Sequence, residues 1–281
     1  MRAHRYLLLD VFTANPLEGN ALAVFPDGDA FPERDMQRMA RELQLSETVF
    51  VLAPQRGGDA RVRIFTPAVE LPFAGHPVLG TAIVLAGERD LDAVTLEMGA
   101  GLVPVSLDAG AGDVRLGWME QPIPSWQPYE RASEALGALG VEASGLPVEV
   151  YDNGPVYVYV ELEDERAVAA LAPDMRALEA LGAVGVVAFA GGAARWKVRM
   201  FAPAEGVPED PATGSAAGPL AVHLARHGRT AFGEEIEIRQ GAELGRPSLL
   251  RARALGTGER VERVLVGGCA VIVARGEFQL G

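Results

Sequence analysis

The two halves of the chain carry similar stretches of sequence. FTPAVELPFAGHPVLGTAIVL, beginning at Phe65, matches FAPAEGVPEDPATGSAAGPLAVHL, beginning at Phe201, in the order of F-x-P-A, proline, glycine turn and apolar segment. With a short insertion, Gly75–His76 falls opposite Gly214–Ser215. Such an internal repeat is typical of a duplicated β/α unit. The alternative is a chance similarity between two strand–turn–helix units. The sequence therefore predicts two similar halves that face each other across a cleft.

Apolar stretches of different period alternate along the chain and indicate a mixed α/β fold. Spacing predicts helices at residues 33–44, 77–88, 132–140, 175–182 and 215–228. Strands are expected at 5–13, 21–27, 46–54, 60–67, 146–154, 155–162, 185–190, 195–203, 235–241, 248–255 and 263–278, and in a β-rich stretch at 94–119 with a hairpin at 108–113. The helix at 77–88 is apolar almost all round, which is typical of a buried helix.

The proline-dense segment QPIPSWQPYE, residues 121–130, is the predicted linker between the halves. We therefore expect an N-terminal half at residues 1–119, with the strand at 271–281 as a candidate addition, and a C-terminal half at 128–270. A chain of 281 residues is long enough for two such domains.

Residue counts exclude several kinds of chemistry. The chain has one cysteine, Cys269, so a disulfide framework, a CxxC redox pair and a two-thiol racemase are impossible within it. Its one lysine, Lys197, would have to form any Schiff base with a pyridoxal-type cofactor. We therefore expect chemistry that needs no cofactor.

Charge and hydropathy limit the partners. The net charge of −13 argues against nucleic acid binding, but a local pocket can still accept a small anionic metabolite. No apolar run reaches the roughly 18 to 20 residues of a membrane span, and the first residues do not resemble a targeting signal. We expect a cytoplasmic protein without a membrane partner.

Each copy of the repeat has a glycine turn that leads into a helix. A helix start leaves backbone N–H groups unpaired at the positive end of the helix dipole, which favours anions. Gly75, followed by His76 and by Pro77 at the expected first helical position, and Gly214 are therefore candidate substrate-binding residues. Their corresponding places in the two halves predict that both helix starts serve one ligand.

Four side chains are candidates for the chemistry itself. Glu47 begins an apolar strand, and burial there would raise its pKa toward the range of a general acid/base. A capping box or an exposed strand end is the alternative. His76 is either a cleft residue or a satisfied structural histidine. Asp210 and Ser215 flank the second glycine turn, where an Asx-turn and a helix N-cap are the alternatives.

His223 and His227 have the i, i+4 spacing of metal ligands on a helix, but no acidic residue lies between them as in HExxH. Histidine near a helix C-terminus suits the helix dipole, and Gly228 follows as a candidate C-cap. We therefore predict no metal site.

Motifs along nearly the whole chain resemble the PhzF family of phenazine-biosynthesis-like proteins. They are NPLEGNALAVF, LSETVFV, RIFTPAVELPFAGHPVLGTA, MFAPAEGVPEDPATGSAAGPL and QGAELGRPS, in this order, and the combination of GHP with EDPATGSA is highly specific. The resemblance implies a diaminopimelate epimerase-like fold: two pseudo-symmetric α/β halves, each a curved mixed sheet or barrel around a central helix, with the active site between them.

The resemblance also implies an activity and a set of residues. The epimerases place a cysteine at each helix start, but Ala74 and Pro211 fall near those positions here. In the PhzF family a glutamate instead carries a single proton, and the match falls on Glu47. The family's histidine, aspartate and serine fall on His76, Asp210 and Ser215. Asn20, in the first motif, is a further predicted substrate-binding residue.

The expected function is a cofactor-independent isomerase that shifts a proton on a small carboxylate-bearing metabolite, of the kind used on the route to phenazines. The resemblance implies a homodimer. Two alternatives stay open: an amino-acid epimerase that uses Glu47 with His76 as the opposing base, and a binding or scaffold protein without turnover. A scaffold would need none of the four side chains.

Overall fold

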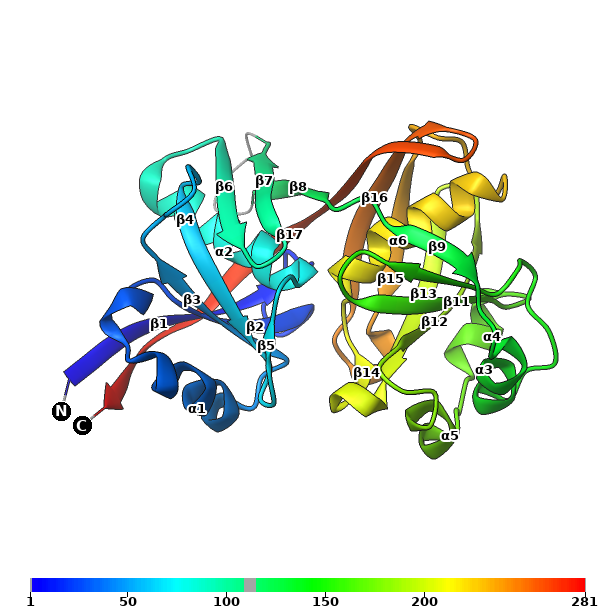
Figure 1. Ribbon diagram of the computed structural model, residues 1–281, viewed down its shortest axis with the longest axis horizontal. Coiled ribbons are helices and arrows are strands. Elements are labelled where there is room, and N and C mark those ends of the chain that lie inside the picture. The colour runs from blue at the N-terminus through cyan, green and yellow to red at the C-terminus, as the bar shows by residue number, and fades with distance from the viewer. Residues whose placement is uncertain (1, 109–114, 281) are drawn as a thin grey trace. The chain divides into compact units, whose positions relative to one another are not determined.

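The computed structural model describes residues 2–108 and 115–280 of the chain (Figure 1). Contacts divide the chain into two compact units, one formed by Met1–Glu120 with Gly267–Gly281 and the other by Gln121–Val266. The chain returns to the first unit within its last strand, β17 (Arg260–Leu280).

The N-terminal unit is built on a closed barrel. Its other strands are β1 (Arg2–Val11), β2 (Asn20–Phe25), β3 (Glu47–Leu52), β4 (Ala60–Phe65), β5 (Glu70–Leu71), β6 (Ala93–Met98), β7 (Gly101–Leu107) and β8 (Leu116–Gln121). β2 pairs with β3 and β4 with β6 in parallel, and the pairs β1/β2, β3/β4, β6/β7 and β7/β8 are antiparallel. β17 pairs with both β8 and β1, which closes an eight-stranded barrel.

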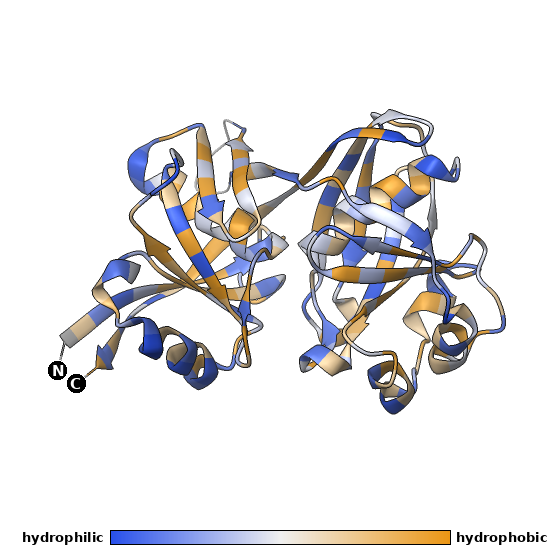
Figure 2. Cartoon of the chain, in the orientation of Figure 1, coloured by the Kyte–Doolittle hydropathy of each residue, from blue (hydrophilic) through white to orange (hydrophobic). Residues whose placement is uncertain are grey.

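Two helices of different character pack on this barrel. In α2 (Gly75–Arg89) the residues from Gly75 to Ala86 are all buried, as expected of a central helix. α1 (Glu33–Leu43) is amphipathic and buries Met36, Met39 and Ala40 against a cluster that includes Phe25 and Phe50. The hydropathy colours of Figure 2 show this contrast, because α1 is largely blue while orange dominates the inner strands.

The C-terminal unit repeats the plan with a curved mixed sheet. Its strands are β9 (Ser125–Pro128), β10 (Glu149–Asp152), β11 (Val156–Glu161), β12 (Gly185–Gly192), β13 (Arg195–Ala202), β14 (Val207–Asp210), β15 (Glu235–Gln240) and β16 (Ser248–Thr257). β11 pairs with β12 and β13 with β15 in parallel, and the pairs β9/β10, β10/β11, β12/β13, β13/β14 and β15/β16 are antiparallel. The helices are α3 (Ala132–Leu139), α4 (Glu165–Ala169), α5 (Met175–Glu179) and the central α6 (Gly214–Arg226), whose residues from Gly214 to Ala225 are buried.

Helix α6 contains a proline in its interior, at Pro219. A proline has no N–H, so the carbonyl of Ser215, four residues earlier, loses its helical donor. Asn153 Nδ2, from the turn after β10, donates to that carbonyl at 2.9 Å. A side chain therefore replaces the missing backbone hydrogen bond, and the helix continues through the proline.

The predicted mixed α/β fold, with a curved sheet around an apolar helix in each half, is confirmed. Some details differ. Helix α2 begins at Gly75, so Pro77 is its third residue, a position where its missing N–H also costs no intrahelical bond. The segment at 121–130 is not merely a linker, because it contains β9. The helix α4 was not predicted, and the hairpin at 108–113 lies, apart from Asp108, outside the described residues.

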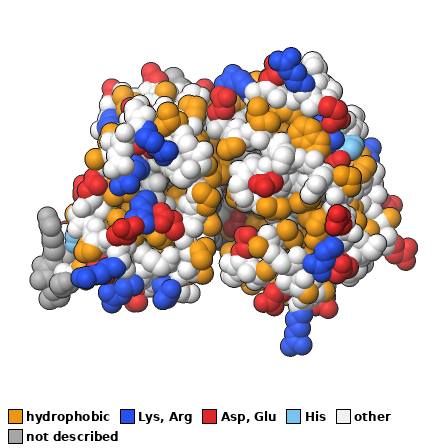
Figure 3. All heavy atoms as spheres, viewed as in Figure 1, with side chains coloured by type: hydrophobic (Ala, Val, Ile, Leu, Met, Phe, Trp, Pro, Cys, Tyr) orange, Lys and Arg blue, Asp and Glu red, His pale blue; other side chains and the backbone are white. Residues whose placement is uncertain are grey.

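Surface charges in both units are mixed in sign. Figure 3 shows Lys and Arg side chains interspersed with Asp and Glu on the face in view. Among the described residues, no helix combines the length and the apolar composition needed to cross a membrane.

Candidate active site

Three predicted residues meet at one end of the barrel of the N-terminal unit. Glu47 is the first residue of β3 and Asn20 the first of the parallel neighbour β2, whose Leu22 lies opposite Glu47. His76 is the second residue of α2. Its Nε2 lies 3.1 Å from Glu47 Oε2, and its Nδ1 lies 3.4 Å from Asn20 Nδ2. Parallel strands that begin at the same edge thus bring both partners to the histidine.

The atoms next to the His76 ring indicate which of its nitrogens carries the proton. An amide nitrogen only donates, so Asn20 Nδ2 requires Nδ1 as an acceptor, which leaves the proton on Nε2. That nitrogen lies 3.1 Å from Glu47 Oε2, but the contact does not have the geometry of a hydrogen bond. Burial lowers the pKa of His76 to about 3, and the ring is therefore neutral near pH 7. A neutral ring thus lies in contact with the Glu47 carboxylate.

Asp210, the last residue of β14, is held in a braced turn. Its Oδ2 accepts a hydrogen bond from Thr213 Oγ1 at 2.6 Å, and the aspartate is only 7% exposed. Gln240, at the end of β15, donates to the Asp210 carbonyl at 2.8 Å and accepts from the Thr213 N–H at 3.2 Å. The aspartate therefore bonds to a hydroxyl within its turn, and the Asx-turn expected as the alternative stays a prediction.

Ser215 is the second residue of α6 and does not cap the helix. The N-cap residue is Thr213, and no side chain makes the cap hydrogen bond. The hydroxyl of Ser215 instead lies 2.6 Å from the hydroxyl of Tyr157 on β11. The N-cap interpretation of this serine is therefore wrong, which leaves its side chain available for another role.

The two predicted glycines begin the central helices. Gly75 is the first residue of α2 and Gly214 the first of α6, and both are buried. Gln121 Nε2 donates to the Gly214 carbonyl at 2.8 Å, which fixes this turn from a different strand. Glu47, His76, Asn20 and Gly75 thus lie together in one unit, and Asp210, Ser215 and Gly214 in the other. That both helix starts serve one ligand stays a prediction.

Comparisons with known proteins decide the family. A family model described as phenazine biosynthesis-like protein, PhzC-PhzF, matches residues 9–276. The trans-2,3-dihydro-3-hydroxyanthranilate isomerase of Pseudomonas aeruginosa is 54% identical over 277 residues, which cover 99% of this chain and 100% of that one. The chain belongs to the PhzF family.

Solved structures agree on the fold of this PhzF protein. A Bacillus anthracis protein of the PhzF family matches with a TM-score of 0.86 at 24% identity and covers 100% of both chains. A probable proline racemase from Agrobacterium radiobacter matches with a TM-score of 0.64 at 13% identity, over 99% of this chain and 93% of that one. The fold is thus shared with a racemase, and the protein is an isomerase, as its relatives are named.

The PhzF protein lacks the two thiols that a cysteine-based racemase would need. Ala74 is the residue before α2, and Pro211 lies three residues before α6. The single cysteine, Cys269, lies on β17, far along the chain from both helix starts. The single lysine, Lys197, forms an ion pair with Glu243 at 2.6 Å. A racemase mechanism that uses two thiols is therefore not open to this chain.

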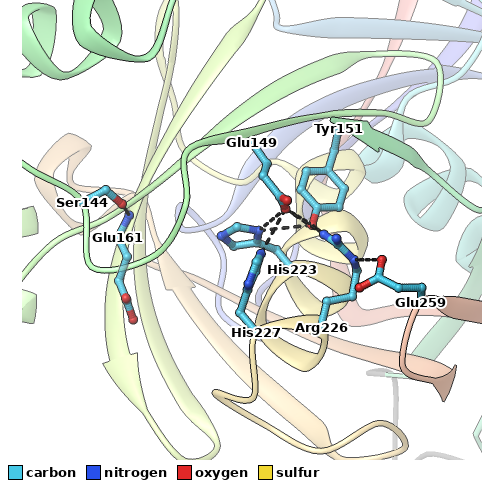
Figure 4. Close-up of polar contacts among 8 residues, drawn as sticks. All are labelled: Ser144, Glu149, Tyr151, Glu161, His223, Arg226, His227 and Glu259. Carbon is cyan, nitrogen blue, oxygen red and sulfur yellow. Dashed lines mark hydrogen bonds and ion pairs between the residues drawn. The ribbon is translucent and has the colours of Figure 1, made fainter. Parts of the chain in front are cut away.

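The structure also assembles a cluster that the sequence did not predict. Glu149 Oε2 lies 3.2 Å from His223 Nδ1, 3.1 Å from His227 Nε2 and 2.7 Å from Arg226 Nη1 (Figure 4). Tyr151 OH donates to the same oxygen at 2.9 Å. The i, i+4 spacing of the histidines pointed to this place, but their carboxylate partner is more than 70 residues away in sequence and gave no signal.

This cluster resembles a metal site only in part. Each of Glu149, His223 and His227 offers one ligand atom, and the three atoms lie within 4.8 Å of one another. Burial alone would raise the pKa of Glu149, but hydrogen bonds from His223, Arg226 and His227 outweigh it and hold the pKa well below its usual range. Arg226 already supplies the positive charge at this oxygen, so the cluster joins helix α6 to β10 as an ionic network. A carboxylate that is so firmly ionised is also a poor general base.

Proposed function

We propose that this protein isomerises trans-2,3-dihydro-3-hydroxyanthranilate, with Glu47 as the single acid/base. The observation that carries the proposal is the pairing of Glu47 Oε2 with His76 Nε2 at 3.1 Å. It occurs in a chain whose 54% identical relative is named as an isomerase of this compound. The substrate carries a carboxylate, which fits the small anionic metabolite expected from the sequence.

The reaction requires only a proton transfer. The ionised Glu47 carboxylate removes a proton from a carbon of the substrate, and the electron pair of that C–H bond enters the substrate's unsaturated system. The protonated Glu47 then returns the proton to another carbon on the same face, and a new C–H bond forms. The atoms and electrons balance, and Glu47 ends ionised as it began.

His76 supports Glu47 throughout this cycle. Its Nε2 lies beside the carboxylate, and its neutral ring adds no charge that would hold the proton back. Asn20 keeps the ring in the tautomer that carries the proton on Nε2. We therefore assign Asn20 to the orientation of His76, in addition to its predicted contact with the substrate.

The remaining predicted residues bind the substrate in this proposal. The starts of α2 and α6, at Gly75 and Gly214, present backbone N–H groups that suit a carboxylate. Asp210 and Ser215 supply an acceptor and a hydroxyl for the amino and hydroxyl groups. A cytoplasmic location and a homodimer stay predictions from the sequence.

The geometry disfavours an epimerase that uses Glu47 and His76 as opposing bases. Inversion with two bases needs one on each side of the reacting carbon. The carboxylate oxygen and the imidazole nitrogen lie 3.1 Å apart, within direct contact of each other, which leaves no room for a carbon between them. These groups therefore act from one side, as a proton shift on one face requires.

The first prediction tests Glu47 with the substitution Glu47→Gln. Glutamine keeps the shape and a hydrogen bond but cannot titrate, so kcat on trans-2,3-dihydro-3-hydroxyanthranilate should fall by about 10²- to 10⁴-fold. Affinity measured by calorimetry should stay within about tenfold, or roughly 1.4 kcal/mol, of the wild-type value. Wild-type turnover in D₂O should place deuterium at the carbon that receives the proton.

A matched control is Glu97→Gln. Glu97 is a buried glutamate of the same unit that accepts hydrogen bonds from the N–H groups of Gln55, Arg56 and Gly58. This variant should lose stability but keep kcat, since the carboxylate binds backbone N–H groups of a nearby loop. Near-normal turnover by a folded Glu47→Gln protein would refute the assignment.

A further inference from the structure

Tyr157 makes a contact with the candidate site that no sequence motif indicated. It lies on β11 and is 7% exposed, and its hydroxyl lies 2.6 Å from Ser215 Oγ. The two residues are 58 positions apart in sequence. A hydroxyl pair this short is a strong neutral hydrogen bond, and it restricts the serine side chain to one rotamer.

The ring of Tyr157 is itself held in place by a glycine. Tyr157 lies opposite Gly185 in the parallel pair β11/β12. A Cβ atom at Gly185 would lie 2.7 Å from Tyr157 Cδ1 and 2.9 Å from Cε1. The ring thus occupies the space that any other residue at position 185 would fill, so its hydroxyl has a fixed direction.

Neighbouring side chains bind the same helix start, but they bind its backbone. Tyr159, two residues along β11, donates to the Ala216 carbonyl at 2.7 Å. Asn153 and Gln121 donate to the carbonyls of Ser215 and Gly214. These three contacts anchor the helix, whereas Tyr157 contacts a functional group of the candidate site.

We propose that Tyr157 is a positioning residue that orients the Ser215 hydroxyl toward the substrate. A phenol is a better hydrogen-bond donor than an alcohol, so Tyr157 donates to Ser215 Oγ. The serine's own proton is then directed away from the tyrosine and donates to an acceptor atom of the substrate. The substrate contact rests on the proposed function of the site, but the orientation of the hydroxyl does not.

Tyr157→Phe tests this role because it removes one oxygen and keeps the ring against Gly185. Loss of one hydrogen bond predicts a three- to tenfold lower kcat/KM for trans-2,3-dihydro-3-hydroxyanthranilate, at roughly 1 kcal/mol per bond. In a Ser215→Ala background the same substitution should change kcat/KM by less than about twofold, since the partner is gone. Tyr159→Phe is the control, and it should lower stability with kcat/KM within about twofold of the wild type.

Crystal structures of the wild type and of Tyr157→Phe provide a second readout that needs no substrate. Ser215 should occupy one χ1 rotamer in the wild type and a different one, or several, in the variant. An unchanged rotamer would overturn the proposal, as would equal losses of kcat/KM in the two backgrounds. If the wild type does not turn over this substrate, the proposed function fails, and the rotamer still decides the role of Tyr157.

Discussion

His76 is buried and yet lies beside a carboxylate. It is 4% exposed, and burial lowers its pKa to about 3. The adjacent carboxylate of Glu47 would favour a charged ring, but the cost of burying that charge is larger. The histidine therefore stays neutral over the whole physiological range of pH.

This property predicts a pH dependence of stability. In the folded protein His76 takes up a proton only near pH 3, whereas in the unfolded chain it does so near its ordinary value of 6.5. Below pH 6.5 the unfolded state binds more protons, so acid destabilises the fold. Between pH 7 and pH 5 this group should remove about 2 kcal/mol of the free energy of unfolding, as measured by urea titration.

The matched variant is His76→Gln, whose amide keeps a donor but does not titrate. Its free energy of unfolding should fall less between pH 7 and pH 5, by the contribution of this one residue. Parallel pH curves for the two proteins would contradict the neutral assignment. A nitrogen NMR spectrum of the imidazole at pH 6 offers a direct check, since it should report a proton on Nε2 alone.

The sequence predicted these residues unequally. LSETVFV placed Glu47 at the start of a buried strand, and the glycine turn placed His76 at the start of a helix. The hydrogen-bond partners of the site residues in the second half were harder to predict, because a hydrogen bond such as Tyr157–Ser215 joins distant segments. Sequence spacing indicates neighbours within one helix or strand only. It suggested a capping role for Ser215, but the N-cap residue is Thr213.

At the scale of elements, glycines inside the central helices mark close packing. Gly218 lies within α6, and a Cβ there would collide with Gln121 Oε1 and lie 2.6 Å from Val264 Cγ1. Gln121 cannot move freely because its Nε2 binds the Gly214 carbonyl. Gly218→Ala should therefore lower the free energy of unfolding by about 1 to 3 kcal/mol despite the better helix propensity of alanine.

Gly137→Ala in α3 is the control, because a Cβ there meets nothing within 4 Å. This variant should gain up to about 1 kcal/mol from helix propensity. Thermal unfolding of both proteins would measure the difference. Equal stabilisation by the two substitutions would show that a methyl group fits at position 218 without a steric clash.

Most elements followed from local patterns, and the exceptions have physical reasons. Alternation predicted β4, where Arg61 and Arg63 face outward between buried residues. The prolines of residues 121–130 suggested a linker, yet Pro128 takes part in β9, whose pairing with β10 tolerates it. The short α4 escaped prediction, although α5, which also has five residues, was predicted.

At the scale of the whole molecule, we expect activity without a metal ion. The cluster of Glu149, His223 and His227 is the site at which a metal would matter, and Arg226 already neutralises the carboxylate. Dialysis against a chelator should leave kcat unchanged within error. Lost activity that Zn²⁺ or another divalent ion restores would contradict this and would revive the histidine pair as a metal centre.

The repeat was the sequence feature that reached furthest toward the whole fold. The two F-x-P-A segments predicted a duplicated unit, and each one leads into a central buried helix, α2 or α6. The repeat does not predict how the barrel of the N-terminal unit closes. Closure depends on the pairing of β17 with β1, and the sequence of neither strand alone indicates which strand it pairs with.

That closure has a consequence for the order in which the protein forms on the ribosome. β1 pairs with β17 from Arg2 opposite Leu280 to Val11 opposite Ala270, so β1 has no such partner until β17 has been synthesised. Residues 121–266 form a compact unit of their own and do not depend on the final segment in this way. Domains usually fold in the order of synthesis. In this nascent chain the second half can therefore be complete while the N-terminal barrel is still open along one seam.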